Sequence, residues 1–159
     1  MPESSTPTVL IVDDEEMVLT ALRSFLTLET SYRVLTMNSP ESALETIRNE
    51  PVDVAVADFM MPAMDGIEFL RRAREIRPAA SRVLLTGYAD VQNAIRAINE
   101  AGLYYYLEKP WDNDRLKLVI RNSVERSALV NELDARITAL ENANGELFEM
   151  RKKLIRAFL

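Results

Sequence analysis

The 159-residue sequence contains neither cysteine nor histidine. Without cysteine there is no disulfide, no thiolate metal ligand and no cysteine nucleophile. Without histidine the chain also lacks the commonest general base, the commonest metal ligand and any Ser-His catalytic pair. Metal binding or acid–base chemistry in this chain would therefore depend on carboxylates.

Long apolar runs are missing too. No run approaches the roughly 18 residues of a membrane span, and the N-terminal MPESSTPT lacks the basic-then-apolar pattern of a secretory signal. The net charge of −6 and the pI near 4.8 argue against a nucleic-acid-binding surface, which would be basic. We therefore expect a cytoplasmic globular protein that binds neither membranes nor nucleic acid.

Short apolar segments alternate with amphipathic ones along the first 125 residues. This alternation predicts an α/β domain with a parallel sheet and right-handed crossovers. We expect a disordered N-terminus over 1–7, one domain over 8–125, and a helix over 126–159 that leaves it. The predicted strands are 8–12, 32–36, 52–57, 82–85 and 103–107; the predicted helices are 16–28, 40–48, 67–74, 90–100 and a last one from 113 onward.

Polar residues follow four of these strands. Asp13 and Asp14 end the first, Asp58 the third, Thr86 the fourth and Lys109 the fifth. Because ligands of open parallel sheets bind beyond the carboxyl ends of the strands, we expect these side chains to converge. Three close carboxylates favour Mg²⁺, and a phosphoryl group would be neutralised by the metal and the lysine. An aspartate can carry such a group as an acyl phosphate.

The sequence contains four notable motifs: DD at 13–14, DFMMPAMDG at 58–66, LTGY at 85–88 and YLEKPW at 106–111. Together they resemble the receiver domain of two-component response regulators. The resemblance covers residues 8 to about 125. It implies a flavodoxin-like (βα)5 fold with strand order 2-1-3-4-5, the order that such folds share.

The resemblance also implies roles for the converging residues. Asp58 would accept a phosphoryl group from a sensor histidine kinase or a phosphotransfer protein. Asp14 and Asp58 would bind Mg²⁺ directly with the backbone carbonyl of Met60, and Asp13 would act largely through water. Lys109 would contact the phosphoryl oxygens, and the Lys109–Pro110 bond is expected to be cis.

The same resemblance implies a conformational response. Thr86 would move toward the phosphoryl group, and Tyr106 would follow from an outward to an inward rotamer. The face formed by the fourth helix, the fifth strand and the fifth helix would then transmit the signal. In receivers Met60 and Tyr88 stand at positions that flank the path of the hydrolytic water. Neither is a good base and both can block water, so we expect slow autodephosphorylation.

From Val130 the sequence shows heptads. β-Branched residues at one core position, leucine at the other and a single Asn favour a parallel two-stranded coiled coil. We therefore expect a homodimer through 126–159, although a helix folded back on its own domain or a solvated linker would also use such a segment. The first core position is occupied by Val130, Ile137, Asn144, Arg151 and Phe158, the second by Leu133, Leu140, Leu147 and Leu154.

The chain ends inside an unfinished amphipathic pattern, which we interpret as the start of a missing output domain. By analogy, receivers of this type resemble those fused to HD-type phosphodiesterases, PP2C-like phosphatases or diguanylate cyclases. Two alternatives to a signalling switch stay open: a Mg²⁺-dependent phosphohydrolase that passes through an aspartyl phosphate, and a binding module that works without phosphorylation. The hydrolase is disfavoured because such enzymes usually carry a D-x-D pair, whereas Phe59 and Met60 follow Asp58.

Overall fold

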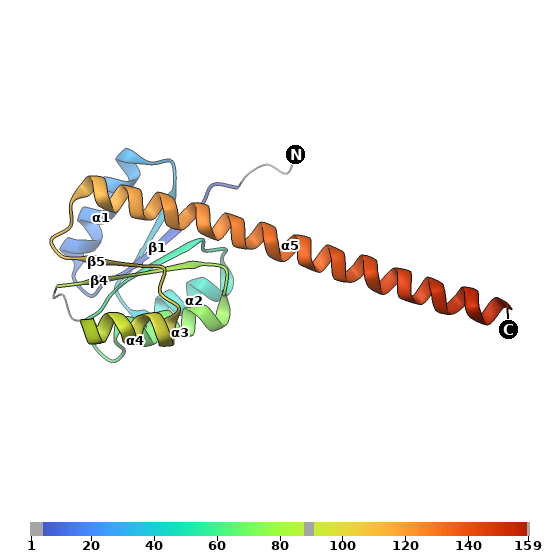
Figure 1. Ribbon diagram of the computed structural model, residues 1–159. Helices are drawn as coiled ribbons and strands as arrows, with labels where there is room; N and C mark the ends of the chain where they lie inside the picture. Colours follow the sequence, from blue (N-terminus) through green and yellow to red (C-terminus); the bar gives the residue numbers. More distant parts are fainter. Residues whose placement is uncertain (1–4, 88–90, 159) are drawn as a thin grey trace. The chain divides into compact units, whose positions relative to one another are not determined.

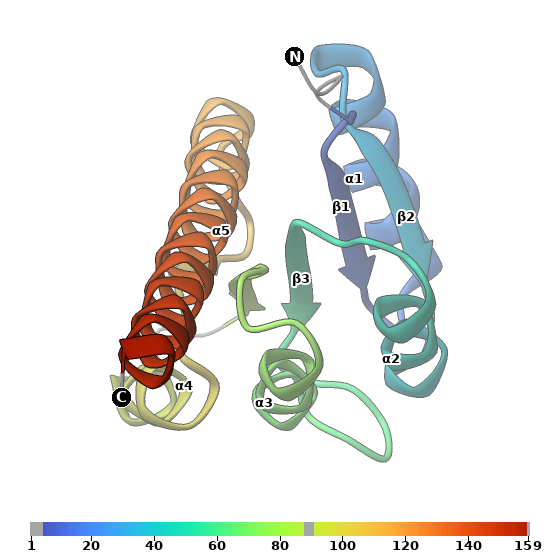
Figure 2. The same cartoon turned by 90° about the vertical axis from the view of Figure 1, so that its right-hand side faces the viewer.

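A five-stranded parallel sheet organises residues 8–108 in the computed structural model, which describes residues 5–87 and 91–158. The strand order is β2-β1-β3-β4-β5, as the flavodoxin-like prediction requires (Figure 1). Figure 2 shows β3, β1 and β2 side by side. The strands are β1 (Thr8–Val12), β2 (Arg33–Met37), β3 (Val54–Asp58), β4 (Ser81–Thr86) and β5 (Tyr105–Glu108).

Helices cover both faces of the sheet. Alternate strand residues point to opposite faces, so Val9 and Ile11 pack with α1 and the first part of α5, whereas Leu10 and Val12 pack with α2, α3 and α4. The central strands β1, β3 and β4 are buried along their whole length, which explains their continuous apolar sequences. The helices are α1 (Glu16–Glu29), α2 (Pro40–Asn49), α3 (Gly66–Ile76), α4 (Val91–Ala101) and α5 (Asn113–Phe158).

Helices α2 and α3 each begin directly after a residue whose side chain caps the helix. The Ser39 hydroxyl accepts the N–H of Ser42 at 3.2 Å, with Pro40 in the first helical position, as predicted. Asp65 caps α3 in the same way and accepts the N–H of Glu68 at 2.8 Å. Helix α3 therefore begins one residue earlier than the periodicity predicts.

β3 and β5 each begin two residues later than predicted. β3 starts at Val54, and the carboxylate of the preceding Asp53 accepts the N–H of Thr8 at 2.8 Å. β5 starts at Tyr105, so Tyr104 lies just before the strand. The buried centre of the sheet is insensitive to these shifts, which fall at the strand ends.

The chain divides into two compact units, residues 1–127 and 128–159. In the second unit the structure describes a single continuous stretch of α5, and Leu133, Leu140 and Leu147 on it are exposed. No helix in the described part of the chain is both long and apolar enough to span a bilayer.

The N-terminal segment predicted to be disordered is described only in part. Residues 1–4 lie outside the described residues, and the Pro7 carbonyl accepts the N–H of Arg33 at 2.9 Å.

Gly66 is the tightest backbone position beside the carboxyl edge. A Cβ on this residue would collide with the carbonyl oxygen of Asp58 and stand 3.0 Å from Leu84 Cδ1. Its own N–H donates to the carbonyl of Phe59 at 2.9 Å, which closes the loop between β3 and α3. A side chain here would push α3 away from the end of β3.

We predict that Gly66→Ala lowers the free energy of unfolding by about 1–3 kcal/mol, the range for overpacking a tight site. Urea unfolding followed by circular dichroism measures it. Gly87→Ala is the matched control, because a Cβ at Gly87 meets no atom within 4 Å. Equal stabilities of the two variants would contradict the steric account.

Candidate phosphoacceptor and metal site

Three carboxylates meet at the carboxyl edge of the sheet. Asp58 is the last residue of β3, and Asp13 and Asp14 directly follow β1. Each offers an oxygen within 4.8 Å of the others. Asp13 is fully buried and Asp58 is 6% exposed, whereas Asp14 faces solvent. The cluster that the sequence predicts is therefore present, with one side open.

Lys109 bridges the two buried carboxylates. Its Nζ lies 3.0 Å from Asp58 Oδ1 and 3.2 Å from Asp13 Oδ2. The lysine is held by its own backbone, because its N–H donates to the carbonyl of Thr86 at 2.7 Å. The Lys109–Pro110 peptide is cis, as predicted. Asp13 is held in a similar way: its Oδ1 accepts the N–H of Glu15 at 2.9 Å.

Burial shifts the titration of this group. Burial is the largest cause that raises the pKa of Asp13 and of Asp58, and neighbouring carboxylates raise both further. Lys109 lowers the pKa of both aspartates, but this effect is smaller than the combined increase. Burial lowers the pKa of Lys109 itself, yet its two carboxylate partners outweigh burial and raise it. The single positive charge of Lys109 therefore offsets only part of the negative charge of the three carboxylates.

This donor set fits a small divalent cation. Carboxylate oxygens with an open, solvated side suit Mg²⁺, which keeps several waters and binds through few carboxylates. Residues Asp13, Asp14 and Asp58 would hold the ion. Met60, the expected source of a carbonyl ligand, lies in the loop after β3 with its side chain 69% exposed. That side chain borders an open cavity of about 440 Å³ that Asp14 and Asp65 also line.

Thr86 and Tyr106 lie on the two neighbouring strands. Thr86 ends β4 and is buried, and Tyr106 lies in β5, half-buried against the core beneath α3 and α4. Residues 84 and 106 are paired in the ladder, so the two side chains belong to adjacent strands near the same edge. Tyr88, the other residue expected at the water path, lies outside the described residues.

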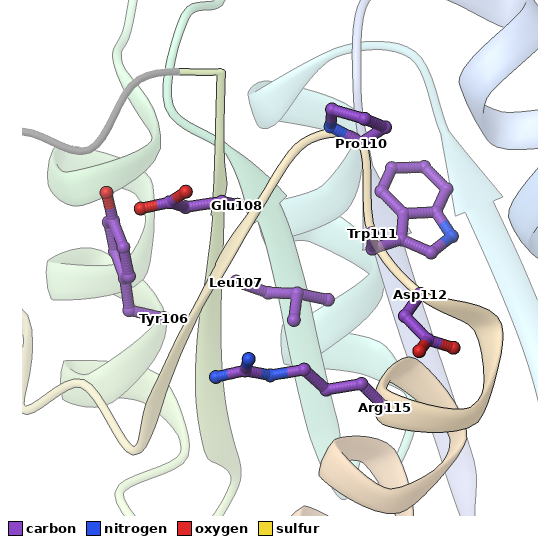
Figure 3. Close-up of a pocket in the computed structure, with 7 residues that line it drawn as sticks. All are labelled: Tyr106, Leu107, Glu108, Pro110, Trp111, Asp112 and Arg115. Carbon is purple, nitrogen blue, oxygen red and sulfur yellow. The ribbon is translucent and has the colours of Figure 1, made fainter.

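A second cavity adjoins Tyr106 and was not foreseen from the sequence. It measures about 370 Å³ and lies between β5 and the start of α5 (Figure 3). Arg115 reaches across and donates to the Tyr105 hydroxyl at 2.9 Å. This contact joins a residue of α5 to a residue of β5, so the local periodicity of the sequence does not predict it. The lining residues are Tyr106, Leu107, Glu108, Pro110, Trp111, Asp112 and Arg115.

Comparison with known proteins agrees with this geometry. A family model described as the response regulator receiver domain matches residues 9–121. The chain belongs to the response regulator receiver family. The hydrogenase transcriptional regulatory protein HoxA of Cupriavidus necator is 40% identical over 126 residues, which are 79% of this chain and 26% of HoxA. Regulatory protein AtoC of Escherichia coli is 31% identical over 79% of this chain and 27% of AtoC.

Solved receiver structures share the fold. The signal receiver domain of an HD domain-containing protein from Pseudomonas fluorescens superposes with a TM-score of 0.75 at 33% identity, covering 78% of this chain and 98% of that one. A CheY-like receiver domain protein from Methanospirillum hungatei gives 0.73 at 31% identity, covering 78% and 98%. The receiver thus spans about a quarter of the curated relatives it matches and nearly all of the isolated receiver structures.

We predict that Asp13→Asn stabilises the metal-free protein, because it removes a buried charge whose raised pKa shows that ionisation is unfavourable there. The sign follows from linkage: a carboxyl with a raised pKa loses folding stability as the pH rises through its folded pKa. Urea unfolding at neutral pH in EDTA measures the midpoint, which should rise. With Mg²⁺ the wild type should gain more stability than the variant.

The control for this prediction is Glu15→Gln. Glu15 is an exposed neighbour of the cluster and supplies no oxygen to it. This variant should keep the full stabilisation by Mg²⁺. An Asp13→Asn protein that is less stable without metal, or equally stabilised by Mg²⁺, would contradict the assignment of Asp13.

Proposed function

We propose that this receiver is cytoplasmic and accepts a phosphoryl group on Asp58 from a sensor histidine kinase or phosphotransfer protein. The observation that carries the proposal is the contact of Lys109 Nζ with Asp58 Oδ1 at 3.0 Å, beside two further carboxylates. In the step, a carboxylate oxygen of Asp58 attacks phosphorus, the P–N bond to the donor imidazole breaks, and the imidazole nitrogen takes a proton.

The residues around Asp58 suit this transfer. Lys109 is already within ion-pair distance and would follow the negative charge from the carboxylate to the phosphoryl oxygens. Thr86, at the end of the adjacent strand, would donate its hydroxyl to another oxygen. Mg²⁺ held by the three aspartates would supply the remaining positive charge. Catalysis would be positioning and charge neutralisation, as is general for phosphoryl transfer.

Acyl-phosphate lifetime would depend on the open side of the site. Met60 is exposed beside Asp14 and carries no group that could activate water. We therefore propose a phosphorylated state that lasts minutes or longer.

Phosphorylation by a small acyl-phosphate donor with Mg²⁺ tests the proposal. Intact-mass analysis should show one phosphoryl group on the wild type and none on Asp58→Asn, with Asp53→Asn as the control because Asp53 lies at the opposite end of β3. After donor removal, the added mass should decay over minutes. Beryllofluoride should likewise bind at Asp58. A native protein that acquires no mass would remove the acceptor role, and loss within seconds would remove the slow-hydrolysis proposal.

The alternative hydrolase would behave differently in the same assay. Steady release of phosphate from small phosphoesters over many turnovers would favour it over a switch. HoxA is named a transcriptional regulatory protein and AtoC a regulatory protein, and each is about four times as long as the matched region, so their outputs are not transferred to this chain.

We also propose that α5 continues into a homodimeric parallel coiled coil. The helix runs unbroken to Phe158, and the leucines at its second core position are more than half exposed, for example Leu140 at 65%. Apolar residues that recur every seven positions on one exposed stripe favour pairing with an identical helix. Repacking of Thr86 and Tyr106 would then reach the dimer through the face of α4, β5 and α5.

We predict that Leu140→Glu weakens the dimer at least about tenfold, because it places a charge in the apolar seam. Sedimentation equilibrium of the full chain measures the dissociation constant. Asn142→Glu adds the same charge at an outward heptad position and should leave dimerisation unchanged. A monomeric wild type at high concentration, or equal effects of both substitutions, would favour a solvated or folded-back helix.

A further inference from the structure

Three guanidinium groups gather at the amino end of the sheet, away from the phosphoacceptor. Arg82 lies in β4 and is only 4% exposed. Arg74 reaches it from α3, and Arg126 from α5. Arg82 and Thr86 stand at opposite ends of the same strand, roughly 13 Å apart at the usual rise per residue. The cluster of Arg74, Arg82 and Arg126, here named the arginine cluster, is therefore separate from the Asp58 site.

Gly102 brings two of these groups together. It has a φ of +58°, and a Cβ on it would lie 3.2 Å from Nη1 of Arg74 and 3.2 Å from Nη2 of Arg82. Both guanidinium groups therefore border one bare Cα, and glycine satisfies both the backbone conformation and the close approach. A larger residue would separate the two arginines.

Arg126 completes the cluster from the other side. Its Nη1 donates to the hydroxyl of Ser81, the residue before Arg82, at 3.3 Å. Its guanidinium carbon lies 5.4 Å from the centre of the Tyr104 ring, within the range of a cation–π contact. Tyr104 in turn donates its N–H to the Arg82 carbonyl at 2.8 Å. The third cation is thus positioned by neutral groups around Arg82.

No negative charge balances these groups within the described residues. Arg82 donates to three carbonyls, of Pro78, Ala80 and Gly102, and its Nη2 has no hydrogen-bond partner there. The pKa of Arg82 is lowered to about 10, chiefly by burial and also by the charges of Arg126 and Arg74. By contrast Arg33, Arg71 and Arg96 each pair with a carboxylate.

Such an arrangement is unfavourable without a counter-ion. A buried cation is normally paired, because desolvation of its charge costs several kcal/mol. Here a nearly buried guanidinium stands beside two others in a chain of net charge −6. An anion that accepts from more than one guanidinium group would offset this charge.

We propose that the arginine cluster binds a phosphate-type anion. A phosphate carries between one and two negative charges at neutral pH and offers at least three acceptor oxygens, which matches several guanidinium forks better than a single carboxylate does. The anion is free phosphate, pyrophosphate or the diphosphate of a nucleotide, which share this chemistry. When bound, it bridges α3, β4 and α5.

Calorimetric titration of the full chain with pyrophosphate in EDTA tests this inference, because without Mg²⁺ the Asp58 site presents an uncompensated excess of carboxylates. The wild type should bind saturably, and the amide resonances of Gly102 and Tyr104 should shift. Arg74→Gln and Arg126→Gln should each weaken binding at least about tenfold, because each removes a charge-assisted contact. Parallel titrations with inorganic phosphate and ADP identify the source, since whichever binds most tightly is the favoured form.

Arg23→Gln is the matched control. Arg23 is an exposed arginine of α1, and its substitution removes the same charge from another element. It should bind pyrophosphate like the wild type. Both test residues lie at the periphery of the cluster, so circular dichroism melts near the wild-type value should confirm that the variants fold. No saturable binding to the wild type, or equal weakening by Arg23→Gln, would overturn the proposal.

Discussion

The ion pairs of Lys109 with Asp13 and Asp58 are the constraint on which the active edge depends. Three carboxylates that converge at the end of a buried sheet would repel one another, and burial makes that repulsion stronger. The ammonium at 3.0 Å and 3.2 Å from two of them offsets part of it, but the raised pKa of both buried aspartates shows that the balance is incomplete. The residual negative charge would favour a divalent cation, and that cation together with Lys109 would offset the charge of a phosphoryl group on Asp58.

The fold supplies this geometry through backbone contacts more than through side chains. The Lys109 N–H is fixed by the carbonyl of Thr86, the Phe59 N–H by that of Leu85, and the Gly66 N–H by that of Phe59. The acceptor strand, the lysine strand and the loop after Asp58 are thereby joined in one hydrogen-bonded edge. A movement of Thr86 would therefore act directly on the segment that carries Lys109 and, through Leu84 two residues further back in β4, on its strand partner Tyr106.

Much of this edge is predictable from the sequence because it depends on strand ends. The apolar runs locate the strands, and parallel topology then brings Asp13, Asp58 and Lys109 together. The order of the strands came from the family resemblance, since periodicity does not specify which strands are neighbours. Arg115 on Tyr105, and Arg82 beside Gly102, were not foreseen, because these contacts join residues of different elements and leave no local pattern.

The same parallel sheet separates charge of opposite sign at its two ends. In β4, Thr86 borders the carboxylates and Arg82 borders two further guanidinium groups, although the chain as a whole is acidic. At the carboxyl end the excess negative charge is opposed in part by Lys109, and a bound divalent cation would offset the rest. At the amino end Arg82 contacts neutral carbonyls, so the corresponding component is an added anion. Because α5 supplies Arg126 and then continues to Phe158, an anion there would fix the base of the helix that is proposed to dimerise.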